Sequence, residues 1–307
     1  MKIVVLSRGP HLYSTQSIVR AARRKGHYVV VIDHMYCDLV NEKGEIEIFY
    51  EGRKIKGVSA IIPRIGSSAT SYGALVIRHF QHRGVYSTVK PEALLKARNK
   101  FASLQILAFN GVQVPKSILS SKAYQLDELF DELRDPPYII KMLKSTHGLG
   151  VLKGDTKDQA IQLVEAFSNM KQKFLMQEFI EESKGTDIRA FVVGGKVVAS
   201  MKRTAPEGEF RSNLHRGGRG IPVSLSEEEE RTAIRSAELM GLSIAGVDML
   251  QSSRGPLILE VNSSPGLEGI EKTTGKDIAS TVINYVAKAV AERKQSPSKR
   301  RKIKRNA

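Results

Sequence analysis

Three oxygen-bearing side chains in the last fifth of the chain have the types and spacing of a metal site: Asp248, Glu260 and Asn262. Their neighbours are mostly apolar, which predicts a hairpin of two buried strands. Because side chains alternate along a strand, Glu260 and Asn262 share one face. If the turn centres on Arg254, Asp248 lies opposite Glu260, and the three groups suit Mg²⁺ or Mn²⁺. The alternative is a carboxylate pair neutralised by arginine or lysine.

Two further features could bind phosphate. The loop Ser145–Gly150 contains glycines, whose backbone N–H groups can approach an anion closely. It joins two predicted strands and lacks the Gly-Lys-Ser/Thr of a P-loop, so a plain β-turn stays the simpler interpretation. Lys141 interrupts the otherwise apolar run Tyr138–Leu143 and therefore needs an anion, either a phosphate or a carboxylate. Lys100 falls on a predicted helix, where a solvated position is the default.

An arginine- and glycine-rich stretch reaches residue 218. Its arginines are Arg203, Arg211 and Arg216, the last two within the run 208–218 that also holds three glycines. Such a stretch is typical of a loop that handles anions. The alternative is a mobile basic surface loop. We assign no role to His215.

The first ninety residues predict a sheet that must position part of this chemistry. Apolar runs predict strands at Lys2–Ser7, Tyr28–Asp33, Ser59–Ile62 and Val85–Thr88. Helices are predicted at Ser14–Lys25 and Tyr72–Gln81, and a small hairpin at 46–55. This alternation indicates a mostly parallel sheet. The turn after the first strand lacks Gly-x-Gly-x-x-Gly, which argues against a dinucleotide fold.

From Pro91 onward the order of the predicted helices and strands changes. A helix is predicted from Pro91 to about Asn110, and we place a domain boundary just before it. Beyond it, hairpins alternate with helices, which indicates an α+β fold with antiparallel sheets. A capping box, Ser226–Glu229, opens one of these helices. The predicted strands are Tyr138–Leu143, Val151–Lys153, Phe174–Ile180, Ile188–Val193, Lys196–Met201, Val247–Gln251 and Pro256–Asn262.

Composition adds two expectations. The 307 residues carry 48 Lys+Arg and 32 Asp+Glu, and eight of the basic residues lie after Glu292 with no acidic residue among them. This end reads as a disordered basic tail, with contact to RNA and a solvated tail without a partner as equal alternatives. No apolar run reaches the ~18 residues of a membrane span. A single cysteine, Cys37, excludes a disulfide within the chain, so we expect a cytoplasmic protein.

In chain order, these residues resemble an ATP-grasp ligase. The motifs are Lys100, Lys141, the Ser145–Gly150 loop, Gln177–Ile180, Asp187, Phe210–Asn213, Asp248 and Leu259–Gly266. The runs Gly208–Gly218 and Ser264–Gly275 resemble the RimK branch, whose members add glutamate to the C-terminus of the sixth small-subunit ribosomal protein. The resemblance implies an ATP-grasp fold of mixed α/β and α+β character. Its parts would be an N-terminal α/β domain (1–93), two α+β subdomains clasping ATP (94–291) and the basic tail (292–307).

The resemblance also implies roles for single residues. Lys100 and Lys141 would hold ATP phosphates, the backbone of Glu178 and Phe179 would read adenine, and Asp187 would bind the ribose. Arg211, Ser212 and Asn213 would lie at the γ-phosphate, where Arg211 and, with less support, Arg203 would stabilise charge. Two Mg²⁺ or Mn²⁺ ions would bind Asp248, Glu260 and Asn262.

The implied reaction is an ATP-dependent ligation of a carboxylate to an amine through an acyl phosphate. The implied partners are L-glutamate and a ribosomal protein, with RNA or ribosome contact through the tail and a homo-oligomer, such as a tetramer. Within the same class, an amino-acid ligase acting on a small molecule or carrier protein is the alternative. A different class is an RNA- or ribosome-binding protein with a degenerate nucleotide site, which the complete set of site residues disfavours.

Overall fold

The computed structural model describes residues 1–120, 122–143, 150–171, 173–214 and 217–295. Most of the Ser145–Gly150 loop, the pair His215 and Arg216, and residues 296–307 lie outside these ranges. What the sequence predicts for them stays a prediction.

The N-terminal sheet is parallel, as predicted. Its order is β2-β1-β6-β7, formed by β1 (Lys2–Leu6), β2 (Tyr28–Ile32), β6 (Ala60–Pro63) and β7 (Tyr86–Ser87). Helix α1 (Tyr13–Arg24) covers one face, and α2 (Thr70–His82) covers the other. Both faces are therefore buried, which explains why these strands are almost continuously apolar.

Next to it lies a small antiparallel sheet that the sequence predicts only in part. The expected hairpin is present as β4 (Glu45–Tyr50) and β5 (Arg53–Lys54). A third strand, β3 (Cys37–Glu42), pairs with β4 along its whole length. Its sequence is polar and largely exposed, so it carries little of the apolar signal from which strands are predicted.

The expected helix from Pro91 to Asn110 is two helices, which corrects that prediction. Helix α3 (Pro91–Arg98) ends at Asn99, whose backbone is extended, and α4 (Lys100–Phe109) begins directly after it. The Asn99 side chain accepts a hydrogen bond from the backbone N–H of Ala102 at 3.1 Å. Asparagine favours such an N-cap over a helix interior. The break makes Lys100 the first residue of α4.

Residues 117–178 build a separate four-stranded antiparallel sheet. Its order is β10-β9-β11-β8, formed by β8 (Ser117–Ser120), β9 (Tyr138–Met142), β10 (Val151–Gly154) and β11 (Phe174–Glu178). Helices α5 (Leu126–Glu132) and α6 (Lys157–Asn169) pack on it and enclose a core of their own around Phe130 and Phe174.

The large sheet has five antiparallel strands in the order β14-β13-β12-β15-β16. They are β12 (Thr186–Val193), β13 (Lys196–Thr204), β14 (Arg219–Pro222), β15 (Ile244–Leu250) and β16 (Leu257–Asn262). Gly194 and Gly195 turn between β12 and β13 with positive φ at both residues, as the predicted hairpin turn requires. The expected register is confirmed, because Asp248 pairs with Glu260.

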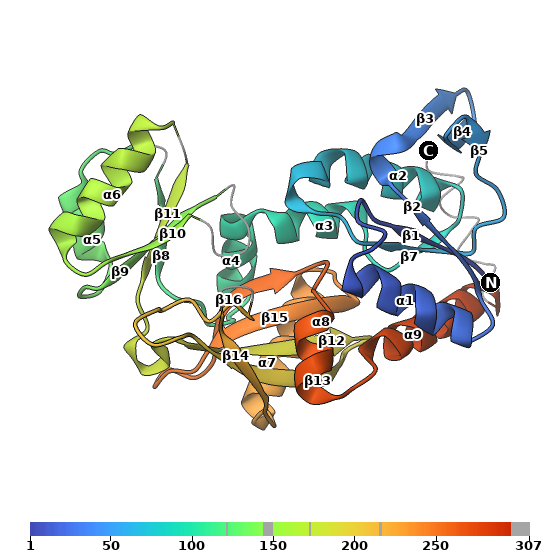
Figure 1. The fold of residues 1–307 in the computed structure, drawn as a ribbon. Coiled ribbons are helices and arrows are strands. Elements are labelled where there is room, and N and C mark those ends of the chain that lie inside the picture. Colours follow the sequence, from blue (N-terminus) through green and yellow to red (C-terminus); the bar gives the residue numbers. More distant parts are fainter. Residues whose placement is uncertain (121, 144–149, 172, 215–216, 296–307) are drawn as a thin grey trace.

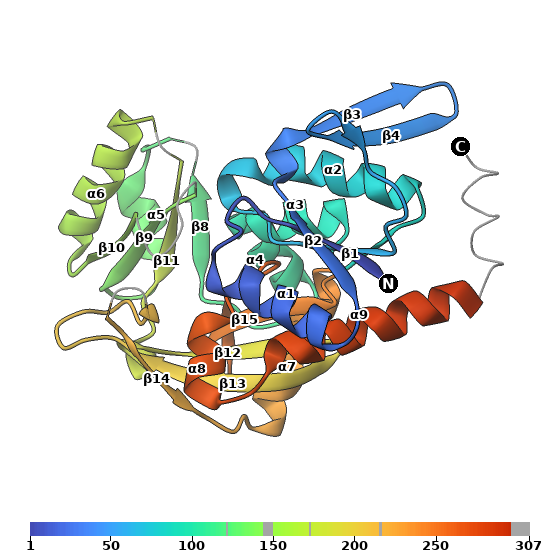
Figure 2. The ribbon, with the colours of Figure 1, turned by 45° about the vertical axis from the view of Figure 1, so that its right-hand side comes forward.

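The three main sheets are unequally joined (Figures 1 and 2). One continuous core links the N-terminal sheet to the large sheet; it includes Val4, Ile61, Ala190 and Val247, together with Ala233 of α7 (Glu227–Leu239). The sheet β10-β9-β11-β8 stands apart on the left in Figure 1, above the large sheet. Lys141 of β9 and Glu260 of β16 lie close enough for their charges to interact, and the region between these two strands is called the groove below.

The C-terminal helices tie the ends of the chain together. Helix α8 (Glu268–Thr274) packs on the large sheet, and α9 (Ile278–Gln295) lies along α1 in both ribbon views (Figures 1 and 2). Helix α9 continues to Gln295, so residues 292–295, expected in the tail, are helical. Within the described ranges, no helix is both long and apolar enough to cross a membrane.

The predicted capping box at the start of α7 is present and gives a test of local stability. The Ser226 hydroxyl accepts from the Glu229 N–H at 3.2 Å, and the Glu229 carboxylate accepts from the Ser226 N–H at 2.8 Å. We expect Ser226→Ala to lower the free energy of unfolding by about 1 kcal/mol. Urea unfolding measures it. The control is Ser224→Ala, an exposed serine whose side chain has no hydrogen bond within the described part, and it should change little.

Candidate functional site

A row of charged residues crosses the large sheet. Arg189 on β12 pairs with Asp248 on β15, and Asp248 pairs with Glu260 on β16. Directly paired residues in an antiparallel sheet project from the same face. Asn262, two residues after Glu260, shares that face. The structure therefore brings together the three residues predicted to hold a metal.

Asp248 is already neutralised by arginine. Its Oδ1 accepts from Arg189 Nε at 2.6 Å, and its Oδ2 accepts from Nη2 of Arg189 at 2.5 Å and of Arg203 at 2.9 Å. Burial raises the pKa of Asp248, but the two adjacent guanidinium groups outweigh burial and hold the pKa well below its usual range. The alternative given above, a carboxylate neutralised by arginine, is therefore confirmed for Asp248.

Arg203 is a buried link between two carboxylates. It is 3% exposed and donates to both oxygens of Asp187, at 2.6 and 2.5 Å, as well as to Asp248. Burial opposes its charge, but the two carboxylates raise its pKa above the ordinary value. Arg203, expected to act on a reacting group, is thus engaged with two protein carboxylates, and Asp187, expected at the ribose, is engaged with Arg203. Its geometry is that of a positioning residue.

Glu260 is differently placed. Its Oε1 accepts from Asn262 Nδ2 at 2.9 Å, and none of the described lysines or arginines forms an ion pair with it. The half-buried Glu260 therefore retains most of its capacity to bind a cation. Asp248 also retains capacity, since a carboxylate offers about four lone-pair sites and Asp248 uses three.

This donor set fits a hard divalent cation. Two carboxylates and one side-chain amide converge on one face, and Mg²⁺ accepts such oxygens while keeping water and phosphate ligands. Among the residues that the structure describes, no cluster of three or more His, Cys, Asp or Glu side chains exists elsewhere as an alternative metal site.

Two lysines on different elements lie close enough to Glu260 for its charge to act on both of them. Lys141 on β9 donates to Gln177 Oε1 at 2.5 Å, and Lys100 at the start of α4 donates to the Met142 carbonyl at 3.0 Å. Burial lowers the pKa of Lys141 to about 8; Glu260 acts against this, and Lys100 adds to it. Burial likewise lowers the pKa of Lys100. Two desolvated cations opposite a carboxylate suit a polyphosphate carrying a divalent cation.

Glu178, at the end of β11, is held by its side chain. Its Oε1 accepts from the Lys116 N–H and from Arg254 Nη2, both at 2.6 Å, and its Oε2 lies 3.2 Å from Arg134 Nε. The Glu178 side chain is therefore occupied, and its N–H donates to the Lys116 carbonyl at 3.0 Å. Adenine recognition by the backbone of Glu178 and Phe179 stays a prediction.

Arg211 reaches across the groove from the loop between β13 and β14. It donates to the Val151 carbonyl on β10 at 3.2 Å and to both oxygens of Glu209, at 3.0 and 2.7 Å. Its hydrogen bond lowers the pKa of Glu209 to about 2. Ser212, which is buried, and Asn213 follow in the same loop. Gly218 closes it, since a Cβ there would lie 2.5 Å from the Ser212 carbonyl oxygen.

Two residues of this site, Arg189 and Gln177, were not predicted from the sequence. Arg189 lies two residues after Asp187 on β12, so strand alternation places both on one face. Strand alternation is the signal that could have identified Arg189, although its direct neighbours on β12 are apolar. Gln177, the hydrogen-bond partner of Lys141, is 1% exposed. It belongs to the motif Gln177–Ile180, but the sequence analysis assigns it no role.

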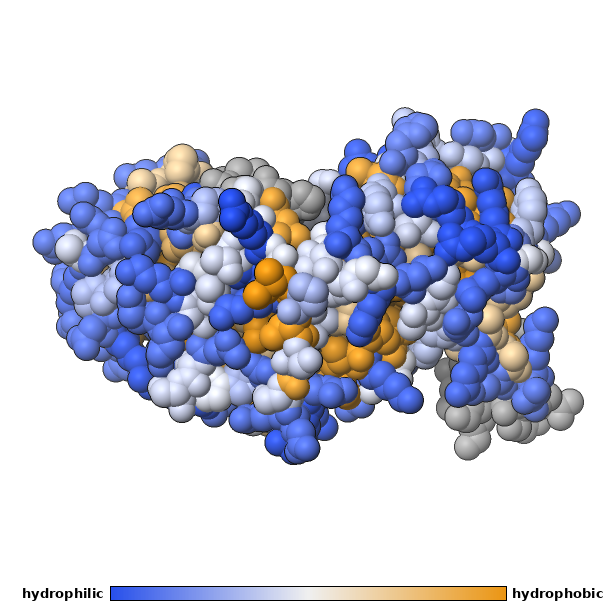
Figure 3. Space-filling model, turned by 60° about the horizontal axis from the view of Figure 1, so that its bottom comes forward, coloured by the Kyte–Doolittle hydropathy of each residue, from blue (hydrophilic) through white to orange (hydrophobic). Residues whose placement is uncertain are grey.

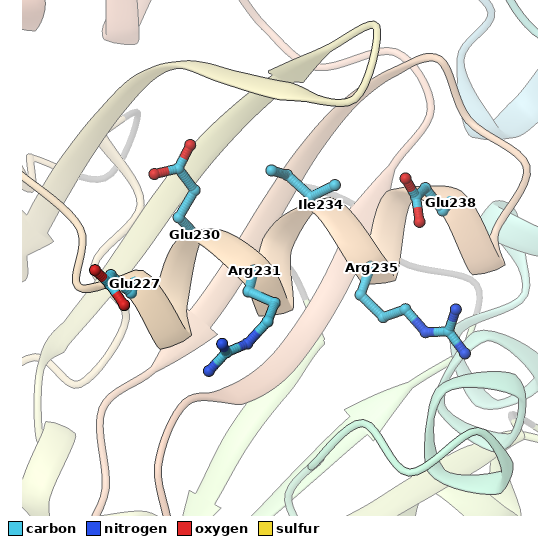
Figure 4. Close-up of a pocket in the computed structure, with 6 residues that line it drawn as sticks. All are labelled: Glu227, Glu230, Arg231, Ile234, Arg235 and Glu238. Atoms are coloured by element: carbon cyan, nitrogen blue, oxygen red, sulfur yellow. The ribbon is translucent and has the colours of Figure 1, made fainter.

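A surface hollow lies away from this site, on α7. It measures about 440 Å³ and is lined only by α7 (Figure 4), by Glu227, Glu230, Arg231, Ile234, Arg235 and Glu238. Six side chains of one helix form an open face and not an enclosed site. The face turned forward in Figure 3 is mostly hydrophilic, with apolar residues gathered near its middle.

The lowered pKa of Lys141 gives a test of its expected contact with phosphate. At pH 8 about half of the Lys141 side chains are uncharged in the free protein, because the pKa is about 8. A bound phosphate favours the charged form, so Mg·ATP binding takes up protons at pH 8 and not at pH 6.5. Calorimetry in buffers of different ionisation enthalpy measures this uptake.

Lys141→Arg is the matched control, because arginine stays charged throughout this range and its contribution to the uptake disappears. Proton uptake at pH 8 that is equal in the wild type and this variant would contradict the assignment.

Comparison with known proteins identifies the family. A model of the RimK pre-ATP-grasp domain matches residues 1–94, and a model of the RimK-like ATP-grasp domain matches residues 97–286. A protein of Cellvibrio japonicus named probable alpha-L-glutamate ligase is 49% identical over 286 residues, which cover 93% of this chain and 95% of the relative. One with the same name from Aliivibrio fischeri is 47% identical over 294 residues, 96% of this chain and 98% of the relative.

Solved structures show the same fold. The ATP-grasp ligase PsnB, complexed with a variant of its minimal precursor, Mg and ADP, superposes with a TM-score of 0.73 at 21% identity, over 94% of this chain and 98% of PsnB. D-alanine–D-alanine ligase from Bacillus anthracis, complexed with ATP, gives a TM-score of 0.67 at 17% identity, over 97% and 99%. The chain belongs to the RimK-like ATP-grasp family and is an ATP-dependent ligase.

Proposed function

We propose that this ligase adds L-glutamate to the C-terminus of a small-subunit ribosomal protein through an acyl phosphate. The observation that carries the proposal is the convergence of Lys100 of α4 and Lys141 of β9 on Glu260 of β16. The names of the relatives, at 47–49% identity over nearly the whole chain, support glutamate as the amine substrate.

The first step transfers phosphate. A carboxylate oxygen of the acceptor attacks the γ-phosphorus, the bond to the bridging oxygen breaks, and ADP leaves. Lys100 at the start of α4, Lys141 on β9 and Arg211 in the β13–β14 loop hold the phosphate charges. A divalent ion bound by Asp248, Glu260 and Asn262, which we propose to be one of two, supplies further charge neutralisation when present.

The second step forms the amide. The amino group of glutamate attacks the acyl carbon, the C–O bond to phosphate breaks, inorganic phosphate leaves, and the nitrogen loses a proton. No protein nucleophile is required, so the chain contributes positioning and electrostatic stabilisation. The backbone of Glu178 and Phe179 holds the adenine, and Asp187, fixed by Arg203, lies at the ribose.

A second acceptor class has an observation in its favour. Two structural neighbours are PsnB, complexed with a precursor peptide, and D-alanine–D-alanine ligase, whose name gives amino acids as its substrates. The fold therefore occurs with substrates of other kinds. We therefore keep an amino-acid ligase acting on a small molecule or carrier protein as the alternative. RNA contact through the tail, a homo-oligomer such as a tetramer and a cytoplasmic location stay predictions.

Product mass separates these possibilities. Purified protein is incubated with ATP, Mg²⁺, L-glutamate and either the sixth small-subunit ribosomal protein or other acceptors. We expect the ribosomal protein to gain the mass of one or more glutamyl units, with one ADP released per unit. The control omits ATP. Glutamate addition to another acceptor, with the ribosomal protein unchanged, would favour the alternative.

Glu260→Gln tests the metal assignment more cleanly than a change at Asp248. Removing the Asp248 carboxylate leaves two arginines without their partner, which affects folding as well as activity. Glu260 has only the Asn262 amide as a hydrogen-bond partner in the described part, so the fold should persist. We expect turnover to fall on the order of 10²-fold or more. Wild-type turnover at saturating Mg²⁺ would refute the assignment.

A further inference from the structure

The carboxyl edge of the N-terminal sheet contains a topological switch point that the proposed reaction does not yet use. In the order β2-β1-β6-β7, the chain leaves β1 through α1 on one face and leaves β6 through α2 on the other. Open α/β sheets bind ligands in the crevice outside the strand ends where the order reverses. Here that crevice lies between β1 and β6.

Arg64 stands at this point. It directly follows β6, and its N–H bonds the carbonyl of Leu6 at the end of β1 at 2.8 Å. Ile62 packs in the core on the α1 side, so strand alternation directs Arg64 to the same side. Ser7, on that side too, bonds the Thr15 hydroxyl in the first turn of α1 at 2.9 Å. Arg64 therefore faces the start of α1 at the sheet edge.

The Arg64 guanidinium has no counter-ion. Among the described residues, no carboxylate, carbonyl or hydroxyl accepts a hydrogen bond from its side chain, although the residue is partly buried. The charge that acts on it is that of Arg98; burial and this like charge lower the pKa of Arg64 to about 10. Arg98 donates to the Ile65 carbonyl, and its Nε is buried without a partner. Two adjacent cations, of which Arg64 has no carboxylate acting on it, are costly unless an anion joins them.

These cations are distinct from those expected to hold phosphate. The charge of Glu260 acts on Lys100, Lys141 and Arg98, but not on Arg64. Arg98 therefore connects the reactive groove to Arg64, which lies beyond the groove on the N-terminal sheet. An anion at Arg64 is thus a second anion, separate from the triphosphate.

The loop after the metal-site strand approaches the same helix end. Leu267 N–H donates to the Ser14 hydroxyl at 2.9 Å, which fixes the loop 263–266 against the start of α1. The hydroxyls of Ser263 and Ser264 are buried and have no partner in the described part. Unpaired buried hydroxyls in a loop that meets the start of α1 indicate room for a polar ligand at this end of the helix.

The edge is concave. A hollow of about 260 Å³ lies between the ends of β1 and β2, and Ser7 and Arg8 line it together with Pro10, Val31, Asp33, Tyr36, Tyr50 and Glu51. Arg64 is not among the residues that line this hollow, so the hollow marks a neighbouring part of the same sheet edge.

We propose that Arg64, supported by Arg98, binds a carboxylate group of the substrate at the switch point between β1 and β6. The inference rests on the proposed glutamate ligation, in which two sources supply this chemistry: the carboxylates of free L-glutamate and those at the end of the acceptor. Arg64 is thereby a specificity-determining residue that selects an acidic substrate, while ATP is held elsewhere.

Steady-state kinetics of Arg64→Gln test the proposal. We expect the KM for glutamate or for the acceptor to rise about 10–100-fold, as the loss of a hydrogen-bonded charge pair predicts, while the KM for ATP stays within about twofold. The substrate whose KM rises is the source of the carboxylate. Arg64→Lys keeps the charge without the two-pronged geometry and should restore part of the loss.

Arg83→Gln is the matched control. Arg83 belongs to the same domain, is exposed and donates only to the Ile55 carbonyl, so neither KM should change. If Arg64→Gln fails to fold, the same measurements on Arg64→Lys decide. The inference is wrong if both KM values stay within twofold of wild type, or if the KM for ATP rises equally.

A binding measurement separates this inference from the proposed function. Calorimetry follows L-glutamate, and separately a peptide ending in glutamate, binding to protein loaded with Mg²⁺ and a non-hydrolysable ATP analogue. Wild-type protein should bind at least one probe about 10–100-fold more tightly than Arg64→Gln, even if no glutamyl product forms in the mass assay. Missing product with Arg64-dependent binding would overturn the ribosomal acceptor alone. Equal or absent binding in both proteins would overturn the role of Arg64.

Discussion

The site depends on how the buried charge of Asp248 is balanced. Asp248 pairs with Arg189 across one strand boundary and with Glu260 across the next, and Arg203 joins it to Asp187. Breaking a buried ion pair on one side costs roughly 3–5 kcal/mol, so these strands tolerate only one register. That register is what presents Glu260 and Asn262 on the face of the groove.

The two lysines and Glu260 bring opposite charges close together without pairing directly. Lys100 and Lys141 are desolvated, and Glu260 is held only by an amide. Neither side is neutralised by the other through a direct ion pair in the described part of the chain. In the proposed complex, a polyphosphate with its divalent cation would bind to both at once: the phosphates would meet the lysines, and the cation would meet the carboxylates. The same reasoning extends to Arg64, where only the negative partner is missing.

The sequence predicted what local patterns determine. The parallel N-terminal sheet followed from apolar runs, the Asp248–Glu260 pairing from one turn, and the start of α7 from a capping box. It failed where a local signal was ambiguous or a partner was distant. Asn99 broke a helix that propensity continued, and the polar strand β3 gave no apolar signal. The arginine partners of Asp248 come from strands 45 and 59 residues away, a choice that the fold makes.

Core packing divides the molecule in a way that matters for catalysis. The N-terminal sheet and the large sheet share one apolar core, so the distance between Arg64 and Glu260 is fixed by dense packing. The sheet β10-β9-β11-β8 has a separate core, and polar contacts such as Lys100 to Met142 and Arg211 to Val151 join it to the rest. Such contacts rearrange at less cost than a core. The molecule can therefore hold rigid the residues that we propose for the substrate carboxylate and the metal, Arg64 and Glu260, while the sheet that carries Lys141 adjusts around a bound nucleotide.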